Sequence, residues 1–459
     1  MKAGPNTNRD PAARQREPRA RRGLVWALCL LTLLVVGVMV YLRPSAHDSA
    51  RVGEAVLPTP VRTPVAVVEA SNAPPASLPP PVAAAPLPLR LGPTNPPAAE
   101  LIANLLNGDL PLKGRREAGR ALARLGSDEA IAALKIALRD GPRYLKAAIC
   151  EGLGESAHPE AKALLLGMLK VGDPITARGA IRGFALRGDT EAVDILGGVL
   201  FDAHQPESLR TESALSLGDI RQPQALAALT RAASEITAPT IAESVLDGLG
   251  RRPIAETAEF FRGYVETPGR PADLKVAALE AIGNAEGDPA PFLLTYGSNP
   301  NPELRAAAAW ALNMAETATD IGPQLLDWLK QESKPEVRAR LYRALGNQDT
   351  YDASAVIALA QRESAPAARL AGFDLLAETC RSAPTPEVLG YFNQTALPEL
   401  KTTALTSESP EHRLSAVMAL QRAGTTLTEG ALQDIARSAT DPKVIAAAQA
   451  ALGSRSANP

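Results

Sequence analysis

The chain has 459 residues, enough for two or three globular units, and 46% of them are hydrophobic, as in ordinary globular proteins. Its 48 Lys and Arg residues nearly balance 50 Asp and Glu residues, so the chain as a whole is not a polycation built for nucleic acid. Three cysteines exclude a disulfide framework, and four scattered histidines are too few for a histidine-based metal site.

The N-terminal segment has the pattern of a membrane anchor. Residues 1–22 contain seven basic side chains and two acidic ones, whereas residues 23–42 (GLVWALCLLTLLVVGVMVYL) carry no charge. A helix of twenty residues is about 30 Å long, which matches the hydrocarbon core of a bilayer. Trp26 and Tyr41 lie near its two ends, where aromatic rings favour the membrane interface. We therefore predict a transmembrane helix over 23–42 and a basic cytoplasmic tail over 1–22.

A cleaved secretory signal is the alternative interpretation of this segment. The apolar core of a signal is about 7–15 residues long and ends at a small-x-small cleavage site. Here the apolar run is longer and ends in Tyr41-Leu42-Arg43-Pro44, a poor context for cleavage. Both interpretations send the rest of the chain across the membrane. Arginine exceeds lysine 37 to 11, which is in keeping with a bacterial source, so the far side is predicted to be the periplasm or the cell exterior.

Residues 43–98 form a predicted disordered linker. Fourteen prolines lie between Pro44 and Pro97, in clusters such as Pro79-Pro80-Pro81. Because proline lacks an amide donor and has a fixed φ, neither a helix nor a sheet can propagate through such clusters. An extended, polyproline-like tether at about 3.1 Å per residue is expected, and it would hold a domain away from the bilayer. An unstructured filler whose length matters little is the alternative.

From residue 99 to the C-terminus, the chain repeats itself with a period near 32 residues. Most of the recurring prolines are followed after three or four residues by a cation, which we call a repeat cation. An Ala-rich apolar run follows and often closes on Leu-Gly or Ile-Gly, as at 152–154, 216–218, 248–250, 281–283, 344–346 and 451–453. The prolines are at positions 142, 174, 206, 239, 271, 302, 335, 366, 410 and 442, and the repeat cations are Lys146, Arg178, Arg210, Lys275, Arg305, Arg338, Arg369 and Arg413.

Each part of this pattern is typical of a helix pair. Proline is favoured at the first helical position, and a closing glycine can adopt the left-handed conformation that ends a helix. A second segment with apolar residues at three- and four-residue spacing follows, as in 158–170. One such pair cannot bury its own apolar face, whereas stacked pairs can. The fold class is therefore predicted to be all-α, an α-solenoid of about eleven helix pairs over residues 99–459.

Two irregularities are expected in this stack. The first unit, at about 99–126, lacks the marker proline. About twelve extra residues separate Pro366 from Pro410, and we expect a loop or a distorted helix within RSAPTPEVLGYFNQTALPEL.

With Pro-x-x-x-Arg-x-x-Ala-x-x-x-Leu-Gly repeating, the region resembles HEAT repeats, and more narrowly the short HEAT-like repeats named after the phycobilin lyases. The resemblance covers about 355 residues and implies a right-handed α-solenoid whose concave face binds another macromolecule. Met314 and Leu376-Ala377 depart from the pattern, because they stand where the closing glycine is expected.

The repeat cations have two interpretations. They could form a stripe for an anionic partner, but the resemblance implies that each one pairs with an acidic or carbonyl group in the turn of a neighbouring repeat. Residues 99–459 contain 37 cationic and 45 acidic side chains, a net charge of about −8 that disfavours nucleic acid as a ligand.

Aromatic residues gather between 260 and 351, and they fill solenoid cores as well as anchoring interfaces. If an interface exists, this is where we expect it. The candidate partner contacts are Phe260, Phe261, Tyr264, Tyr296, Trp310, Trp328 and Tyr342. Cys150 and Cys380 lie in different repeats, too far apart for a mutual bridge, and are predicted to be buried free thiols.

No motif of catalytic or metal chemistry is present in the sequence. The HEAT-like enzyme deoxyhypusine hydroxylase binds iron through His-Glu dipeptides, and none of the four histidines here precedes a glutamate. We find no phosphate-binding glycine loop, no Gly-x-Ser-x-Gly and no zinc-type spacing. No catalytic residue, metal or cofactor is therefore predicted.

The sequence thus predicts a single-pass membrane protein that binds or scaffolds a protein partner on the extracytoplasmic side. Two alternatives stay open at this point: a lyase-like enzyme that processes a chromophore or cofactor, and a purely structural spacer of the cell envelope.

Overall fold

The computed structural model describes residues 97–456, all of which belong to one compact unit. The predicted tail 1–22, the predicted span 23–42 and the linker 43–98, except for its last two residues, lie outside the described residues. None of the helices within residues 97–456 is both long enough and apolar enough to span a bilayer.

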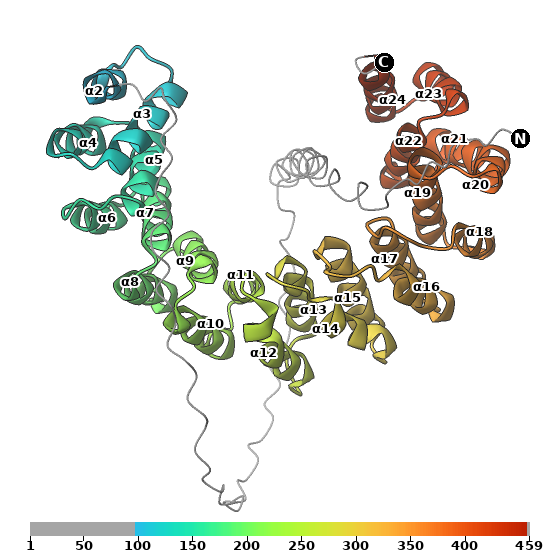
Figure 1. The fold of residues 1–459 in the computed structure, drawn as a ribbon, viewed down its shortest axis with the longest axis horizontal. Coiled ribbons are helices and arrows are strands. Elements are labelled where there is room, and N and C mark those ends of the chain that lie inside the picture. The colour runs from blue at the N-terminus through green and yellow to red at the C-terminus, as the bar shows by residue number, and fades with distance from the viewer. Residues whose placement is uncertain (1–96, 457–459) are drawn as a thin grey trace, which may run out of the picture. The chain divides into compact units, whose positions relative to one another are not determined.

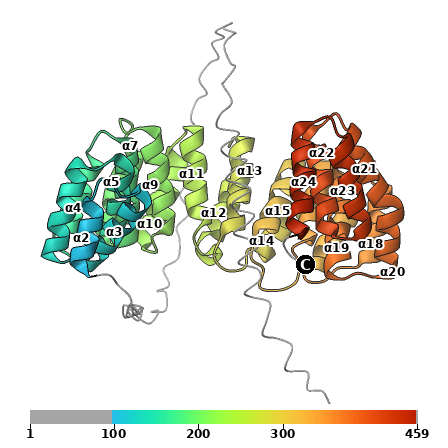
Figure 2. The ribbon, with the colours of Figure 1, turned by 90° about the horizontal axis from the view of Figure 1, so that it is seen from above.

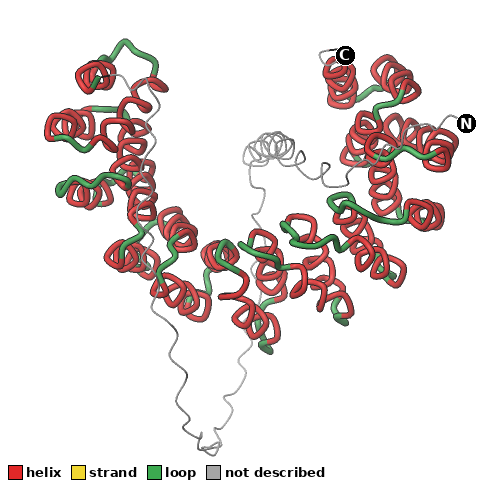
Figure 3. Tube along the Cα trace, viewed as in Figure 1, coloured by secondary structure: helices red, strands yellow, loops and turns green. Residues whose placement is uncertain are grey.

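The described chain is helical throughout, and Figure 3 shows helices joined by short loops. Its only β-type pairing within the described residues is an isolated bridge between Pro253 and Glu286. The first half of the helices is α2 (Ala98–Leu106), α3 (Leu112–Leu125), α4 (Asp128–Asp140), α5 (Arg143–Gly154), α6 (Ala161–Leu169), α7 (Pro174–Arg187), α8 (Thr190–Phe201), α9 (Glu207–Asp219), α10 (Pro223–Glu235), α11 (Pro239–Gly250) and α12 (Ile254–Glu266).

The second half contains short irregular turns between its α-helices. It runs through α13 (Ala272–Ala281), η2 (Ile282–Asn284), α14 (Ala290–Leu294), η3 (Thr295–Ser298), α15 (Pro302–Met314), α16 (Gly322–Gln331), α17 (Pro335–Leu345), α18 (Ala353–Arg362), α19 (Pro366–Ser382), α20 (Pro386–Tyr391), η4 (Phe392–Ala396), α21 (Leu397–Thr406), α22 (Pro410–Ala423), α23 (Thr426–Ser438) and α24 (Pro442–Ser456).

These helices form two layers of a curved stack (Figure 1). An outer helix is followed by an inner helix in each pair, and the helices of successive pairs lie side by side (Figure 2). The inner helices are α3, α5, α7, α9, α11, α13, α15, α17, α19, α22 and α24, which gives eleven pairs within residues 97–456. The predicted number of helix pairs is confirmed.

The marker prolines begin the inner helices. Seven of the ten, such as Pro174, are the first helical residue, and the other three, such as Pro142, precede it as the N-cap. Pro111 is the N-cap of α3, 31 residues before Pro142. The expectation that the first unit lacks this proline is therefore wrong, because Pro111 has the same role there.

The extra residues after Pro366 form a distorted helix, which was one of the two expected outcomes. Helix α19 extends past Leu376-Ala377 to Ser382, and α20, the π-helical turn η4 and α21 follow one another without a break. A π-turn inserts one residue into a helix without ending it. Most of the extra residues lengthen α19 and the continuous helical stretch 386–406, and the π-turn accounts for one of them.

The role of the closing glycines differs from the prediction. Positive φ occurs, among the described glycines, at Gly126, Gly188, Gly269, Gly287 and Gly424, and at none of the predicted Leu-Gly or Ile-Gly closures. Gly154, for example, is a helical residue of α5. A Cβ there would overlap the backbone of Gly183 in α7, and one on Gly283 would come 2.8 Å from the carbonyl oxygen of Ala311. At these two positions glycine is required because neighbouring inner helices touch backbone to backbone, whereas a Cβ on Gly453 would meet nothing within 4 Å.

Candidate functional site

Four of the repeat cations are held in internal ion pairs. Arg305 Nε lies 2.7 Å from Glu332, Arg338 Nε 2.7 Å from Glu363, Arg369 Nε 2.6 Å from Glu399 and Arg413 Nη2 2.7 Å from Asp441. Each carboxylate lies 25–30 residues further along the chain, in the next helix pair.

Repeat cations also cover the ends of the outer helices. Arg210 Nε donates to the carbonyl of Leu200 at 2.9 Å, and Arg338 Nη1 donates to Leu329 at 2.8 Å. The last carbonyls of a helix have no partner within it, so a guanidinium there supplies the missing donor. The structural interpretation of these cations is confirmed for the residues named here, and they are not a stripe available to an anionic partner.

Five of the seven aromatic candidates are buried. Phe261, Tyr264, Tyr296, Trp328 and Tyr342 are between 0% and 8% exposed. Their rings fill the space that the Ala-rich inner helices leave open, and the hydroxyl of Tyr342 donates to Glu363 at 2.9 Å. For these five, the expectation of a surface contact is corrected to core packing. Only two of the candidates, Phe260 and Trp310, are partly exposed.

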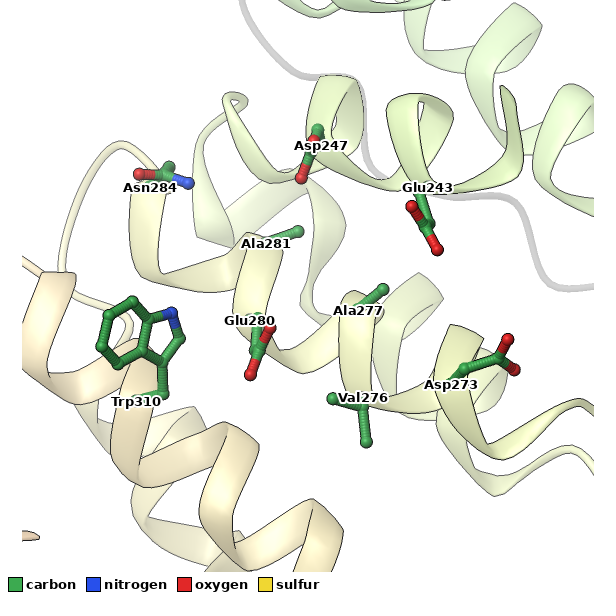
Figure 4. A pocket seen from close by; sticks show the side chains of 9 residues that line it. All are labelled: Glu243, Asp247, Asp273, Val276, Ala277, Glu280, Ala281, Asn284 and Trp310. Carbon is green, nitrogen blue, oxygen red and sulfur yellow. The ribbon is translucent and has the colours of Figure 1, made fainter. Parts of the chain in front are cut away.

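Trp310 lines a cavity of about 460 Å³ on the inner helices. Its walls come from α11, α13 with the adjoining turn η2, and α15, as Figure 4 shows. Four carboxylates contribute to it: Glu243 and Asp247 from α11, and Asp273 and Glu280 from α13. We call this surface the acidic groove.

The carboxylates of the acidic groove influence one another. Partial desolvation by the groove walls raises the pKa of Asp247, repulsion from Glu243 and Glu280 adds to the effect, and Arg251 opposes it. Within the described residues, no three His, Cys, Asp or Glu side chains converge closely enough to hold a metal ion. The four carboxylates are spread over two helices, α11 and α13.

A row of alternating charges on the inner helices ends at this groove. Arg120 of α3 pairs with Glu151 of α5 at 2.6 Å, and Arg182 of α7 lies 3.4 Å from Glu151 and 2.6 Å from Glu212 of α9. Glu243 of α11 is next in line and makes no ion pair with any described residue. The alternation therefore stops where the acidic groove begins, and Glu243 remains available to a ligand.

One cation reaches the groove from two helix pairs away. Arg340 of α17 donates through Nη1 to Glu280 Oε1 at 3.0 Å and to the carbonyl oxygen of Ala306 at 3.0 Å. Its guanidinium carbon lies 5.8 Å from the centre of the Trp310 ring.

None of the four carboxylates was predicted from the sequence, although a signal for two of them was present. Asp247, Glu280 and Trp310 follow their marker prolines, Pro239, Pro271 and Pro302, by eight or nine residues. Aligning the repeats on their prolines would have placed these side chains on neighbouring helices. The partners of Arg340 had no such signal.

The two cysteines of the repeat region are free and buried, as predicted. Desolvation raises the pKa of Cys150 to about 12, and that of Cys380 to about 11. Since the thiolate is the reactive form, these thiols are inert in the folded chain. The lyase-like enzyme and the structural spacer stay untested predictions.

Comparison with known proteins supports the helical-repeat assignment for part of the chain. The family model of HEAT repeats matches residues 98–178 and again residues 170–250, the part of the chain that contains α2 to α11. No curated protein matches the sequence significantly. The narrower resemblance to the repeats of phycobilin lyases stays a prediction.

Several solved structures are similar to the chain at low identity. An engineered protein is 17% identical, with 78% of this chain and 98% of that chain covered and a TM-score of 0.32. Human deoxyhypusine hydroxylase is 19% identical, with 78% and 94% covered and a TM-score of 0.28. Yeast importin-beta (Kap95p) is 15% identical, with 76% and 50% covered and a TM-score of 0.37. At such scores these similarities support no statement about function.

Proposed function

We propose that the helical repeats form a binding domain that holds an extended, cation-bearing segment of a protein partner in the acidic groove. One observation carries the proposal: four carboxylates and a partly exposed Trp310 line one cavity of about 460 Å³ on three neighbouring inner helices. Carboxylates attract Lys and Arg side chains, and an indole ring face attracts the same cations.

The spacing of the helices indicates the form of the ligand. Packed helices lie about 8–10 Å apart. In an extended polyproline II segment, side chains three residues apart share one face and are separated by about 9 Å. A segment with a basic residue at every third position therefore meets α11, α13 and α15 in turn.

The test is binding of a fluorescein-labelled peptide with arginine at every third position to the full-length chain in detergent. We expect the double substitution Glu243→Lys and Asp273→Lys to weaken binding at least tenfold, because it reverses two charges of the groove. The matched control is Glu259→Lys with Asp327→Lys, which changes the net charge equally on the outer helices α12 and α16. Equal losses of affinity in both variants would show that binding depends only on the net charge of the chain. That result would contradict binding in the acidic groove.

We also propose that residues 23–42 anchor the chain in a bacterial membrane, with residues 1–22 in the cytoplasm and the repeats on the extracytoplasmic side. The support is the uncharged run of twenty residues and the seven cations before it. Alkaline phosphatase fused after residue 459 should be active in a bacterial host, since the enzyme needs export to fold. If this fusion is inactive and a reporter that works only in the cytoplasm is active at the same position, the proposed topology is contradicted.

A further inference from the structure

Two residues of the acidic groove, Glu280 and Trp310, already contact a guanidinium, that of Arg340. This residue comes from α17 and reaches past α15 to Glu280 on α13, sixty residues earlier in the chain. A carboxylate, a main-chain carbonyl and an indole ring surround its guanidinium group. These are the partners that a guanidinium uses in protein recognition, because it combines planar donors with a face that stacks on aromatic rings.

The contact is accessible and therefore easily exchanged. The side chains of Arg340 and Glu280 are 32% and 33% exposed. Ion pairs at that exposure are weak, since water competes for both charges, and releasing one shifts an equilibrium by no more than about fivefold. The long arginine side chain can turn into solvent without moving its helix, because its stem is flexible.

We infer that Arg340 is an intramolecular competitor that occupies the end of the acidic groove formed by Glu280 and Trp310 until a cation of the partner replaces it. The inference rests on the proposed function and adds a residue that sets the affinity and specificity of the same groove. Arg340 leaves Glu280 and Trp310 when the ligand binds, and the incoming group takes over the same two partners.

The chemistry of the exchange predicts a preference for arginine. A guanidinium can donate to Glu280 and stack on Trp310 as Arg340 does, whereas an ammonium is a compact, strongly hydrated point charge. Once Arg340 is removed, an arginine ligand therefore gains more than a lysine ligand. A substitution that merely disturbed the local fold would not raise the ratio of the two affinities.

The experiment measures fluorescence anisotropy of two labelled peptides, with arginine or with lysine at every third position, on the full-length chain in detergent at low ionic strength. We expect Arg340→Ala to bind the arginine peptide about two- to fivefold more tightly than the unmodified chain. The lysine peptide should gain less. Arg340→Gln, which keeps a polar side chain, should behave in the same direction.

Arg343→Ala is the matched control. It removes the same charge from the same helix, at an exposed position three residues away, and Arg343 lacks the ion pair with Glu280 that Arg340 makes. A double-mutant cycle with Glu280→Ala gives a second check, since the gain from Arg340→Ala should disappear when Glu280 is absent.

Three outcomes overturn the inference. Arg340→Ala and Arg340→Gln could bind no more tightly than Arg343→Ala, the arginine-to-lysine ratio could stay constant, or the gain could persist without Glu280. None of these results contradicts the proposed function if the double variant Glu243→Lys and Asp273→Lys still binds the peptide more weakly than the unmodified chain does. Failure of the unmodified chain and of both Arg340 variants to bind either peptide refutes the proposed function itself.

Discussion

Glycine on the inner helices serves close packing in this protein. At Gly250 of α11, an added Cβ would overlap the carbonyl group of Ala281 at the end of α13, and the Cβ of Ala281 would be 2.9 Å away. Backbone atoms cannot turn aside as side chains do, so neither helix can accept a methyl group there without moving. In four of the six Leu-Gly or Ile-Gly closures, the glycine thus allows neighbouring inner helices to approach closely: Gly154, Gly218, Gly250 and Gly283.

We predict that Gly250→Ala destabilises the fold by about 1–3 kcal/mol, the usual cost of overpacking a tight contact. Gly263→Ala is the control, because Gly263 lies inside α12, where an added methyl group would meet nothing within 4 Å. Alanine there should stabilise the chain by up to about 1 kcal/mol through helix propensity. Thermal unfolding followed by circular dichroism distinguishes the two, and a stabilised Gly250→Ala variant would contradict the packing argument.

At the scale of elements, a buried pair of charges ties neighbouring helix pairs together. Glu332, which follows α16, has a side chain that is 2% exposed and is bound by Arg305 of α15 through two hydrogen bonds of 2.7 and 2.8 Å. Burial alone would raise the pKa of Glu332, but hydrogen bonds from Arg305 and from the amide of Lys334 outweigh it and hold the pKa below its ordinary value. The pair therefore stabilises the contact only while both groups are charged.

Breaking this pair should be costly. We expect Arg305→Met to destabilise the chain by about 3 kcal/mol, because it leaves the Glu332 carboxylate buried without a partner. Lys330→Met is the control: it breaks the exposed pair with Asp327 and should cost less than about 1 kcal/mol. Denaturant midpoints measure both, and equal shifts would show that the buried pair has no special role.

Acid should weaken the same contact. The folded pKa of Glu332 lies below its unfolded value of about 4.3, so its contribution is fully present above that value. The contribution is lost as the pH falls through the folded pKa. The melting temperature of the unmodified chain should therefore fall more steeply below about pH 4 than that of Arg305→Met, and parallel curves would contradict this assignment.

At the scale of the whole molecule, the repeats are acidic and the proposed ligand is cationic. We therefore expect the affinity for the ligand to depend on pH through Asp247. Its pKa is raised above the ordinary value in the free groove, mainly by desolvation. A bound cation favours the ionised carboxylate, so the affinity for the arginine peptide should be highest above the raised pKa and decrease as the pH falls through it. Asp247→Asn should weaken this dependence, although the other three carboxylates of the groove still titrate. An unchanged pH profile in that variant would exclude Asp247 as a source of it.

The sequence by itself determined the helical period, the number of helix pairs and the positions where inner helices begin. These features depend on local chemistry: proline at a helix start and apolar spacing within each segment act over a few residues. The twelve-residue irregularity was also visible, although a loop and a distorted helix were indistinguishable until the π-turn at 392–396 was seen.

Only the tertiary structure decided which side chains meet. The sequence does not distinguish an aromatic residue in a core from one at an interface. The burial of Phe261 and Tyr342 in the structure assigns both to the core. Each residue advances a helix by about 100°, so a change of one or two residues in repeat length turns a side chain toward or away from the groove. The contact between Arg340 and Glu280 spans sixty residues and passes over an intervening helix, so no local sequence pattern indicates it.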